Sequence, residues 1–277
     1  MGNVKYLVVN ADDYGRTPGV SKGIREAHTN GIVTSTTVMM NMPGVEVELR
    51  RAQQETPKLG LGVHLVLTSG APLLPPARVS SIVGGRNRFP TLQEFTDNLK
   101  AVDADQAVVE WDAQIQRFIK LAGRNPDHLD SHHHASYFSG ALMEKMLILA
   151  EKYHCAIRVI NGGPENSFET VPVEIRDSAK VYYPALFGKY KPNSPDRFIG
   201  AFYDETATTE QLLDILEKLE EGTSELMCHP GYADEILIEG SVYNRQRERE
   251  LSILTSAPIR QAVERRGIQL INFGQLA

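Results

Sequence analysis

The chain has 277 residues, of which 42% are hydrophobic and 23% charged, and its formal net charge is −6. These values are ordinary for a globular protein. The acidic balance argues against nucleic acid and anionic membranes as partners, because proteins that bind them present a basic face. Two cysteines are too few for a disulfide framework, no apolar stretch is as long as a membrane span, and the opening residues lack a secretory signal. We therefore expect a cytoplasmic protein.

Short β-branched apolar runs alternate along the chain with amphipathic stretches. The runs predict strands at residues 4–9, 34–40, 59–67, 126–131, 155–160, 198–204, 224–230 and 268–273. Apolar residues at helical spacing predict helices at 19–29, 45–54, 103–123, 141–154, 208–222 and 244–266. Two proline-rich stretches, 68–104 and 161–197, interrupt this alternation and are expected to be irregular insertions.

The repeated strand and helix units predict an α/β fold with a parallel sheet and helices outside it. About eight units over this length favour an irregular (β/α) barrel of the TIM type, with a doubly wound open sheet as the alternative. No shift in composition marks a boundary, so we expect residues 1–277 to form a single domain.

Aspartates and histidines gather where the predicted strands end. Asp12 and Asp13 follow the first strand, His64 lies near the end of the third, HLDSHHH (128–134) ends the fourth, and His229 ends a later one. In a parallel α/β fold these carboxyl ends lie on one face, where active sites form. We therefore expect one site, assembled from segments more than 200 residues apart.

Aspartate and histidine together suit a divalent metal ion. Three protein ligands leave positions open for water and substrate, which is the pattern of a catalytic metal site. The adjacent acids Asp12 and Asp13 repel each other unless a cation or strong donors hold them. One of the two can bind the metal while the other acts as general base on the metal-bound water.

Three consecutive histidines, His132 to His134, follow the fourth predicted strand. Because neighbouring strand residues face opposite sides of a sheet, we expect His132 and His134 to face the site and His133 to pack elsewhere. Asp130 is a candidate partner that fixes the tautomer of an imidazole ligand, and His134 is given the same supporting role. His128, in the same stretch, is expected to be an ordinary surface or packing residue.

His229 lies between Cys228 and Pro230. A cysteine and histidine nucleophile pair is rejected, because strand neighbours diverge and the cysteine should be buried. His229 then serves as a general acid for a leaving group or as a further ligand. The charged stretch YNRQRERE (243–250) is assigned no role beyond solubility or an interface.

Six stretches of the chain resemble the YdjC-like carbohydrate deacetylases: NADDYG, GIVTSTTVMMN, GLGVHLVLTSG, PDHLDSHHH, ELMCHPG and RERELSILTS. The likeness spans residues 4–273 in the same order. It implies an irregular (β/α) barrel and the metal-dependent hydrolysis of N-acetyl groups on amino sugars or their oligosaccharides, with release of acetate.

Carried onto this sequence, the resemblance implies one divalent metal ion, Mg²⁺ or Zn²⁺, bound by Asp13, His64 and His132. It further implies that Asp12 is the catalytic base and His229 the catalytic acid.

The chain departs from the family after the histidine run. Many relatives continue it as HHHVH, whereas this sequence reads HHHASYF. Tyr137 and Phe138, which follow the run, are expected to stack on a sugar face, and Tyr14 is assigned to substrate binding with them. The insertion at 68–104 is expected to line the rim of the site and to set which oligosaccharide fits.

Two alternatives remain open at this point. A set of two histidines and one carboxylate is also the facial triad of non-haem iron oxygenases, and a non-catalytic sugar-binding protein can share an enzyme fold. The expected partners are a carbohydrate substrate and a second copy of the chain in a homodimer, with neither nucleic acid nor membrane.

Overall fold

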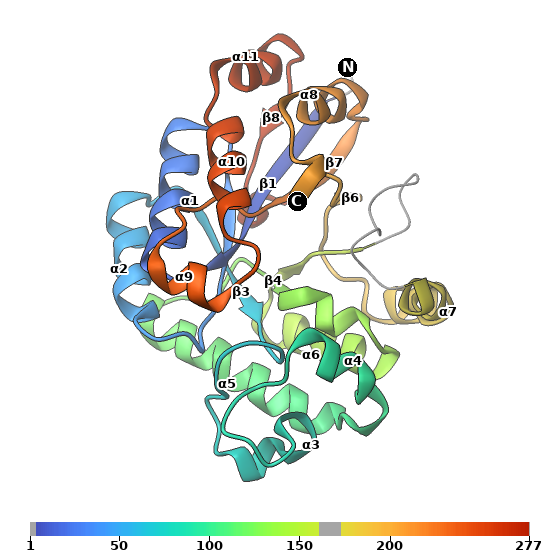
Figure 1. Ribbon diagram of the computed structural model, residues 1–277. Helices are drawn as coiled ribbons and strands as arrows, with labels where there is room; N and C mark the ends of the chain where they lie inside the picture. Colours follow the sequence, from blue (N-terminus) through green and yellow to red (C-terminus); the bar gives the residue numbers. More distant parts are fainter. Residues whose placement is uncertain (1–3, 161–172, 277) are drawn as a thin grey trace.

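The computed structural model describes residues 4–160 and 173–276. At its centre lies a parallel sheet with the strand order β5-β4-β3-β2-β1-β7-β6, and β8 pairs with β1 (Figure 1). The strands are β1 (Lys5–Tyr14), β2 (Ser35–Val38), β3 (Gly60–Leu65), β4 (His128–Ser131), β5 (Ala156–Ile157), β6 (Arg197–Ile199), β7 (Gly222–Cys228) and β8 (Gln269–Leu270). Among the described residues no pairing joins β5 to β6, so the sheet is a half-barrel. The predicted irregular barrel-like α/β fold is confirmed.

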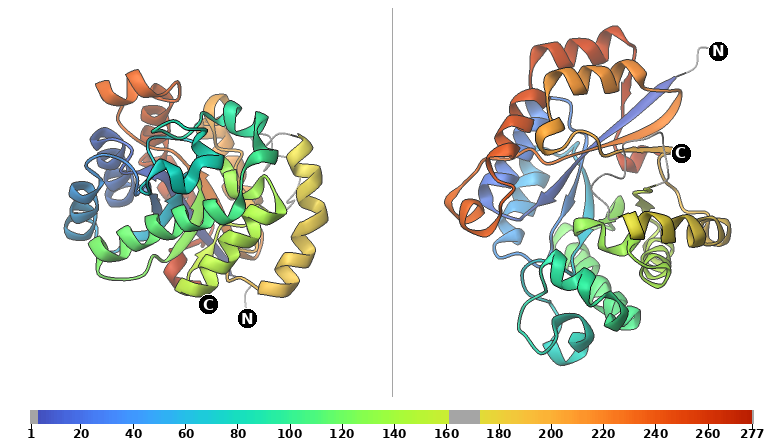
Figure 2. Two further views of the ribbon diagram at one scale, coloured as in Figure 1. Left: turned by 90° about the horizontal axis from the view of Figure 1, so that it is seen from below. Right: turned by 45° about the vertical axis from the view of Figure 1, so that its right-hand side comes forward.

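Helices surround the outer face of this sheet (Figure 2). The longer ones are α1 (Pro18–Asn30), α2 (Val45–Glu55), α5 (Ala104–Ala122), α6 (Gly140–Tyr153), α7 (Val173–Tyr190), α8 (Thr209–Lys218), α10 (Arg245–Leu254) and α11 (Ala257–Arg265). The short helices are α3 (Ser80–Val83), α4 (Leu92–Asp97) and α9 (Glu235–Gly240), with 3₁₀ turns η1 (Pro76–Val79), η2 (Leu99–Ala101), η3 (His132–Tyr137), η4 (Asp204–Thr206) and η5 (Phe273–Gln275). Within the described ranges, none of these helices has both the length and the apolarity needed to cross a bilayer.

Helix α5 shows how the sequence determines one such element. Asp103 caps its start by accepting a hydrogen bond from the Asp105 backbone N–H, and Gly123 ends it with a left-handed φ of 73°. Trp111, Ile115 and Phe118 lie at helical spacing on one face of α5 and are buried. Burial of two large aromatic side chains fixes this helix on the sheet.

The two predicted insertions differ from expectation. The first, 68–104, contains the short helices α3 and α4. The second, 161–197, contains α7, so the prediction of an irregular segment is wrong for residues 173–190, and residues 161–172 lie outside the described ranges. Pro184 lies inside α7, where it removes a helical hydrogen bond, but Leu186 and its aromatic neighbours pack against the core and compensate.

Alternate strand residues face the interior of the half-barrel and form layers. At one end, Val8 of β1 packs with Ala156 and Phe273. Asn10 and Asp12 follow on the same side of β1, because every second residue of a strand faces the same side. The interior therefore changes from apolar to charged toward the carboxyl ends of the strands, where the expected site lies.

Candidate metal centre and active site

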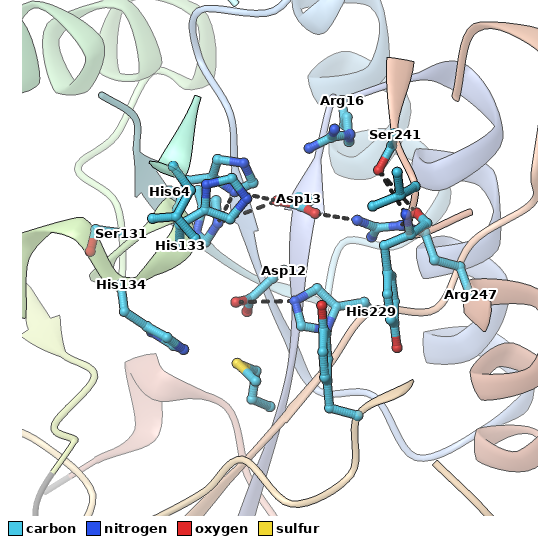
Figure 3. A pocket seen from close by; sticks show the side chains of 16 residues that line it. Asp12, Asp13, Arg16, His64, Ser131, His133, His134, His229, Ser241 and Arg247 are labelled. Atoms are coloured by element: carbon cyan, nitrogen blue, oxygen red, sulfur yellow. Dashed lines mark hydrogen bonds and ion pairs between the residues drawn. The ribbon is translucent and has the colours of Figure 1, made fainter. Parts of the chain in front are cut away.

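A pocket of about 310 Å³ opens at the carboxyl ends of the strands (Figure 3). The five residues predicted to carry the chemistry all line it, although they come from β1, β3, η3 and the end of β7. The full lining is Asp12, Asp13, Arg16, His64, Leu92, Ser131, His132, His133, His134, Tyr203, Met227, His229, Ser241, Val242, Tyr243 and Arg247. These side chains come together at one face of the fold, as predicted from their positions at the strand ends.

Asp12 and Asp13 both reach the pocket because β1 is irregular at its end. Both belong to the strand, whereas the sequence suggested that they follow it. Asp12 continues the inward alternation, but Asp13 adopts a left-handed φ of 71° where the register with β2 shifts. Aspartate tolerates this conformation better than most residues. Two neighbouring carboxylates can therefore face one pocket, which a regular strand would not allow.

Three buried ligand atoms of Asp13, His64 and His132 face one another. Asp13 Oδ1 lies 3.3 Å from His64 Nε2 and 3.1 Å from His132 Nδ1, and the two imidazole nitrogens are 3.3 Å apart. Asp13 Oδ1 accepts no hydrogen bond from the described residues. These separations suit three ligands that each lie about 2.0–2.2 Å from a shared cation. The donor set and its spacing thus fit one divalent metal ion.

Asp130 orients His64, as the sequence suggested. His64 Nδ1 lies 2.6 Å from Asp130 Oδ1, and Thr37 Oγ1 donates to Asp130 Oδ2 at 2.9 Å. With its Nδ1 proton directed at Asp130, His64 presents Nε2 to Asp13 and His132. Burial lowers the pKa of His64, but the carboxylates of Asp130 and Asp13 outweigh burial and raise it to about 10. A cation at Nε2 would replace the second proton of this imidazole.

Arg247 of α10 holds the other oxygen of Asp13. Its Nη2 donates to Asp13 Oδ2 at 2.5 Å, so the carboxylate lies between a guanidinium and the two imidazoles (Figure 3). Burial alone would raise the pKa of Asp13, but Arg247 and His132 keep it well below its usual range. Asp13 is therefore ionised and ready to bind a cation.

The assignment of residues 243–250 to solubility or an interface is wrong. Tyr243, Arg247 and Glu250 are buried, and the first two line the pocket. Arg247 and Glu250 are three residues apart in α10 and share one of its faces, and Tyr243 lies just before this helix. The helical spacing of these residues is the signal that could have found them. The exposed charged residues between them, such as Arg245 and Arg249, made this spacing hard to recognise in the sequence.

Arg158 holds Asp12 and was missed in the sequence. Its two terminal nitrogens donate to the two carboxylate oxygens of Asp12 at 2.7 and 2.8 Å, and its Nε donates to Glu225 Oε1 at 2.8 Å. Arg158 also lies 3.1 Å from Asp130 and is completely buried. Burial opposes ionisation of Asp12, but Arg158 keeps the pKa of this carboxyl well below its usual range. The sequence does contain a signal for this role, since an arginine within the apolar run CAIRVI (155–160) indicates a buried charge that needs partners.

His229, which directly follows β7, is a second neighbour of Asp12. Its Nε2 is 3.9 Å from Asp12 Oδ2, and its backbone N–H donates to Glu250 Oε2 at 2.5 Å. The rings of Tyr203 and Tyr243 contact the imidazole edge-on at 5.4 and 5.6 Å between centroids. Burial lowers the pKa of His229 to about 4, although Asp12 opposes this. His229 is therefore neutral near pH 7 in the resting site.

The prediction for His133 is wrong, because β4 ends before the histidine run. Residues 132–137 form η3, in which His133 and His134 have positive φ values of 53° and 57°. His133 lines the pocket and stacks on His132 with 3.8 Å between ring centroids. His134 also lines the pocket, and its ring contacts Phe198 edge-on. Strand alternation does not apply to residues of a turn.

The three aromatic residues assigned to substrate binding lie in the core, so that prediction is wrong. Tyr14 donates its hydroxyl hydrogen to the Glu48 carbonyl at 2.7 Å, and Tyr137 donates to the Arg158 carbonyl at 2.7 Å. Phe138 packs against Phe95. Each is at most 3% exposed and none lines the pocket.

Two other aromatic residues line the pocket instead. Tyr203 and Tyr243 stack nearly parallel, with 4.5 Å between ring centroids. The insertion at 68–104 contributes Leu92 to the lining. The rim is therefore built by the segments after β6 and β7 as well as by the insertion.

The chain is similar to known proteins over nearly its whole length. Residues 6–265 match the family described as YdjC-like protein. A carbohydrate deacetylase of Thermoanaerobacter pseudethanolicus is 37% identical over 99% of this chain and 100% of its own length. A carbohydrate deacetylase of Enterococcus faecalis is 38% identical over 99% and 98%, and a chitooligosaccharide deacetylase of Citrobacter koseri is 33% identical over 97% and 98%.

Two solved structures are similar to this chain. A crystal structure from Enterococcus faecalis, provisionally described as a cellobiose-phosphate cleavage protein, has a TM-score of 0.86 at 37% identity and covers 99% of both chains. A family 4 carbohydrate esterase of Streptomyces lividans, at 11% identity with a TM-score of 0.50 over 98% of this chain and 93% of that one, shares the fold. By the match of the family model and by its full-length relatives, this chain belongs to the YdjC-like family.

Proposed function

We propose that this protein is a metal-dependent carbohydrate deacetylase, which hydrolyses the N-acetyl groups of amino sugars or their oligosaccharides to acetate and a free amine. The observation that carries the proposal is the cluster of Asp13, His64 and His132, whose ligand atoms lie 3.1–3.3 Å apart within a pocket. The names of the full-length relatives support the same reaction and substrate class.

Asp13, His64 and His132 would hold the single divalent ion. Two imidazoles and one carboxylate suit Zn²⁺ better than Mg²⁺, which prefers oxygen ligands. When bound, the ion would supply Lewis acidity toward the acetyl carbonyl and lower the pKa of water. Arg247 and Asp130 would keep the ligands Asp13 and His64 in position through the hydrogen bonds described above.

Asp12 would act as general base and His229 as the proton donor to the departing amine. Arg158 holds both oxygens of Asp12, and Oδ2 is the one nearer His229. Because His229 is neutral at rest, it must gain a proton during the reaction. The 3.9 Å between the two groups is short enough for a proton taken up by Asp12 to reach His229 through one water or a small movement.

The test is an acetate-release assay on N-acetylated glucosamine oligomers with Zn²⁺ or Mg²⁺ under anaerobic conditions. We expect acetate and free amine in equal amounts, which hydrolysis requires and an oxygenase cannot supply without oxygen. H132A should lose both activity and bound metal, whereas H154N, a change at an exposed histidine, should behave as the wild type. Binding of the oligomer without acetate release, with either metal, would instead support a sugar-binding protein.

Three expectations from the sequence stay predictions: the homodimer, the cytoplasmic location and the single domain. Light scattering of the purified protein tests the first, and limited proteolysis tests the last.

A further inference from the structure

Asn10 and His128 form a completely buried polar layer directly beneath Asp12, between the apolar end of the half-barrel and the pocket. His128 Nε2 lies 2.9 Å from Asn10 Oδ1, and Asn10 Nδ2 donates to Asp12 Oδ1 at 2.9 Å. We propose that His128 is a positioning residue, which fixes the Asn10 amide so that Asn10 holds Asp12 in its reactive orientation. This inference rests on the proposed function, in which Asp12 is the base.

The direction of the hydrogen bonds follows from the surroundings of the imidazole. His128 Nδ1 has no hydrogen-bond partner among the described residues, so the single proton of a neutral ring belongs on Nε2. Burial, with a smaller contribution from Arg158, holds the pKa of His128 well below its usual value, which keeps the ring neutral. His128 therefore donates to Asn10 Oδ1, and the Asn10 NH₂ group faces Asp12. The reversed amide would bring its oxygen within 2.9 Å of a carboxylate oxygen, which is repulsive.

The ring of His128 is held in this orientation by its neighbours. It stacks on Phe273 with 3.8 Å between centroids and an angle of 11°. A Cβ at position 62 would lie 2.6 Å from Nδ1 and Cε1 of the ring, so only glycine leaves room for it there. A ring fixed in this way gives its N–H group a fixed direction.

Packing alone does not account for a histidine at this position. A buried imidazole loses its hydration, and leucine or phenylalanine would pack on Phe273 without that cost. What the imidazole adds is the donor to Asn10. Through it, Asp12 Oδ1 accepts hydrogen bonds from both Asn10 and Arg158, while Oδ2 is the oxygen that faces His229. The carboxylate then cannot rotate about its terminal bond without losing donors.

The experiment compares variants of His128 in the acetate-release assay, with bound metal and thermal midpoint measured on each preparation. H128L removes the donor, and we expect kcat to fall roughly 10- to 100-fold with KM and metal content unchanged. H128Q places an amide N–H near the former Nε2 and should restore most of kcat. Because His128 acts through Asn10, the double variant N10L/H128L should be no slower than N10L alone.

The outcomes separate this inference from the proposed function. A folded H128L that keeps kcat within twofold of an active wild type overturns the positioning role. Equal losses of kcat in H128L and H128Q also overturn it if they are accompanied by a lower thermal midpoint or a lower metal content. Such losses would indicate a structural role only. If H128L does not fold, the comparison of H128Q with N10L decides: high activity in the first and low activity in the second supports the role, and any other pair contradicts it. A wild type without deacetylase activity refutes the proposed function, and this inference with it.

Discussion

Arg247 and Asp13, which are 234 positions apart in the chain, form a buried ion pair with 2.5 Å between Nη2 and Oδ2. The arginine lies on α10 and the aspartate at the end of β1, so this contact joins a helix of the C-terminal part of the chain to the proposed metal ligands. It also gives Asp13 a partner in the absence of metal.

Replacing Arg247 by methionine should destabilise the metal-free protein by about 3–5 kcal/mol, because a buried charge loses its partner. Divalent metal should recover part of this loss, since the cation takes over the neutralisation of Asp13. Denaturant unfolding with and without Zn²⁺ measures both effects. R245M, at an exposed position of the same helix, is the control and should change stability by less than about 0.5 kcal/mol. Equal stability of R247M and R245M would show that the ion pair is not important.

Replacing Arg158 by lysine should preserve folding better than it preserves activity. Lysine keeps the positive charge among Asp12, Asp130 and Glu225 but cannot bind both oxygens of Asp12. We expect kcat to fall at least roughly tenfold, with bound metal unchanged. Steady-state kinetics and metal analysis of the same preparation check this, and an R158K protein with the kcat of the wild type would contradict it.

Metal removal should lower the thermal midpoint, because an ion held by the proposed ligands would bind the folded chain only. At a free metal concentration 100 times the dissociation constant, the ion adds about 2.7 kcal/mol of stability. Chelation followed by readdition of Zn²⁺ should therefore move the midpoint down and back by several degrees. In D13A and H64A, metal should leave the midpoint unchanged. A shift in these variants as large as in the wild type would place the ion elsewhere.

Substitution of an aromatic residue that lines the pocket and of one that lies in the core should have different effects. Y203A removes a side chain that lines the pocket, so KM for the oligosaccharide should rise while the unfolding free energy changes little. Y137F removes a buried hydrogen bond to the Arg158 carbonyl, so stability should fall by about 1 kcal/mol with KM unchanged. Kinetics and denaturant unfolding of both variants test this. A raised KM in Y137F would return Tyr137 to the substrate site.

Acid should destabilise the metal-free protein partly through His128. The folded state keeps this ring neutral because its pKa lies well below the ordinary value, whereas the unfolded chain binds a proton near pH 6.5. The unfolded state thus holds more protons below that pH, and stability falls as the pH decreases. Between pH 6.5 and 5, the wild type should lose up to about 1.4 kcal/mol per pH unit more than H128L. Denaturant unfolding across this range measures the difference. Parallel plots of unfolding free energy against pH for the two proteins would contradict it.

Periodicity predicted most of the fold because it depends on local patterns. The strand and helix units, their parallel arrangement and the face that carries the site all follow from alternation along the chain. The helix α7 was missed, because the prolines of residues 161–197 favoured an irregular segment. The stability of this helix depends instead on packing against α6 and the core.

Individual site residues were harder to place where the backbone leaves regular geometry. Asp13 and His133 have positive φ values, which direct their side chains into the pocket against the strand alternation. Arg158 and Arg247 were missed for another reason. Their roles are visible only when the carboxylates of Asp12 and Asp13, more than 100 positions away in the chain, are brought beside them.

The central claim is that hydrolysis depends on one cation held by Asp13, His64 and His132. A titration of metal-free protein with Zn²⁺ tests it directly, with bound metal and acetate release measured at each point. Acetate release should rise in proportion to bound metal, reach a plateau at one ion per chain, and stay near zero throughout in H64A. Full acetate release by the metal-free protein, or by H64A, would contradict the claim.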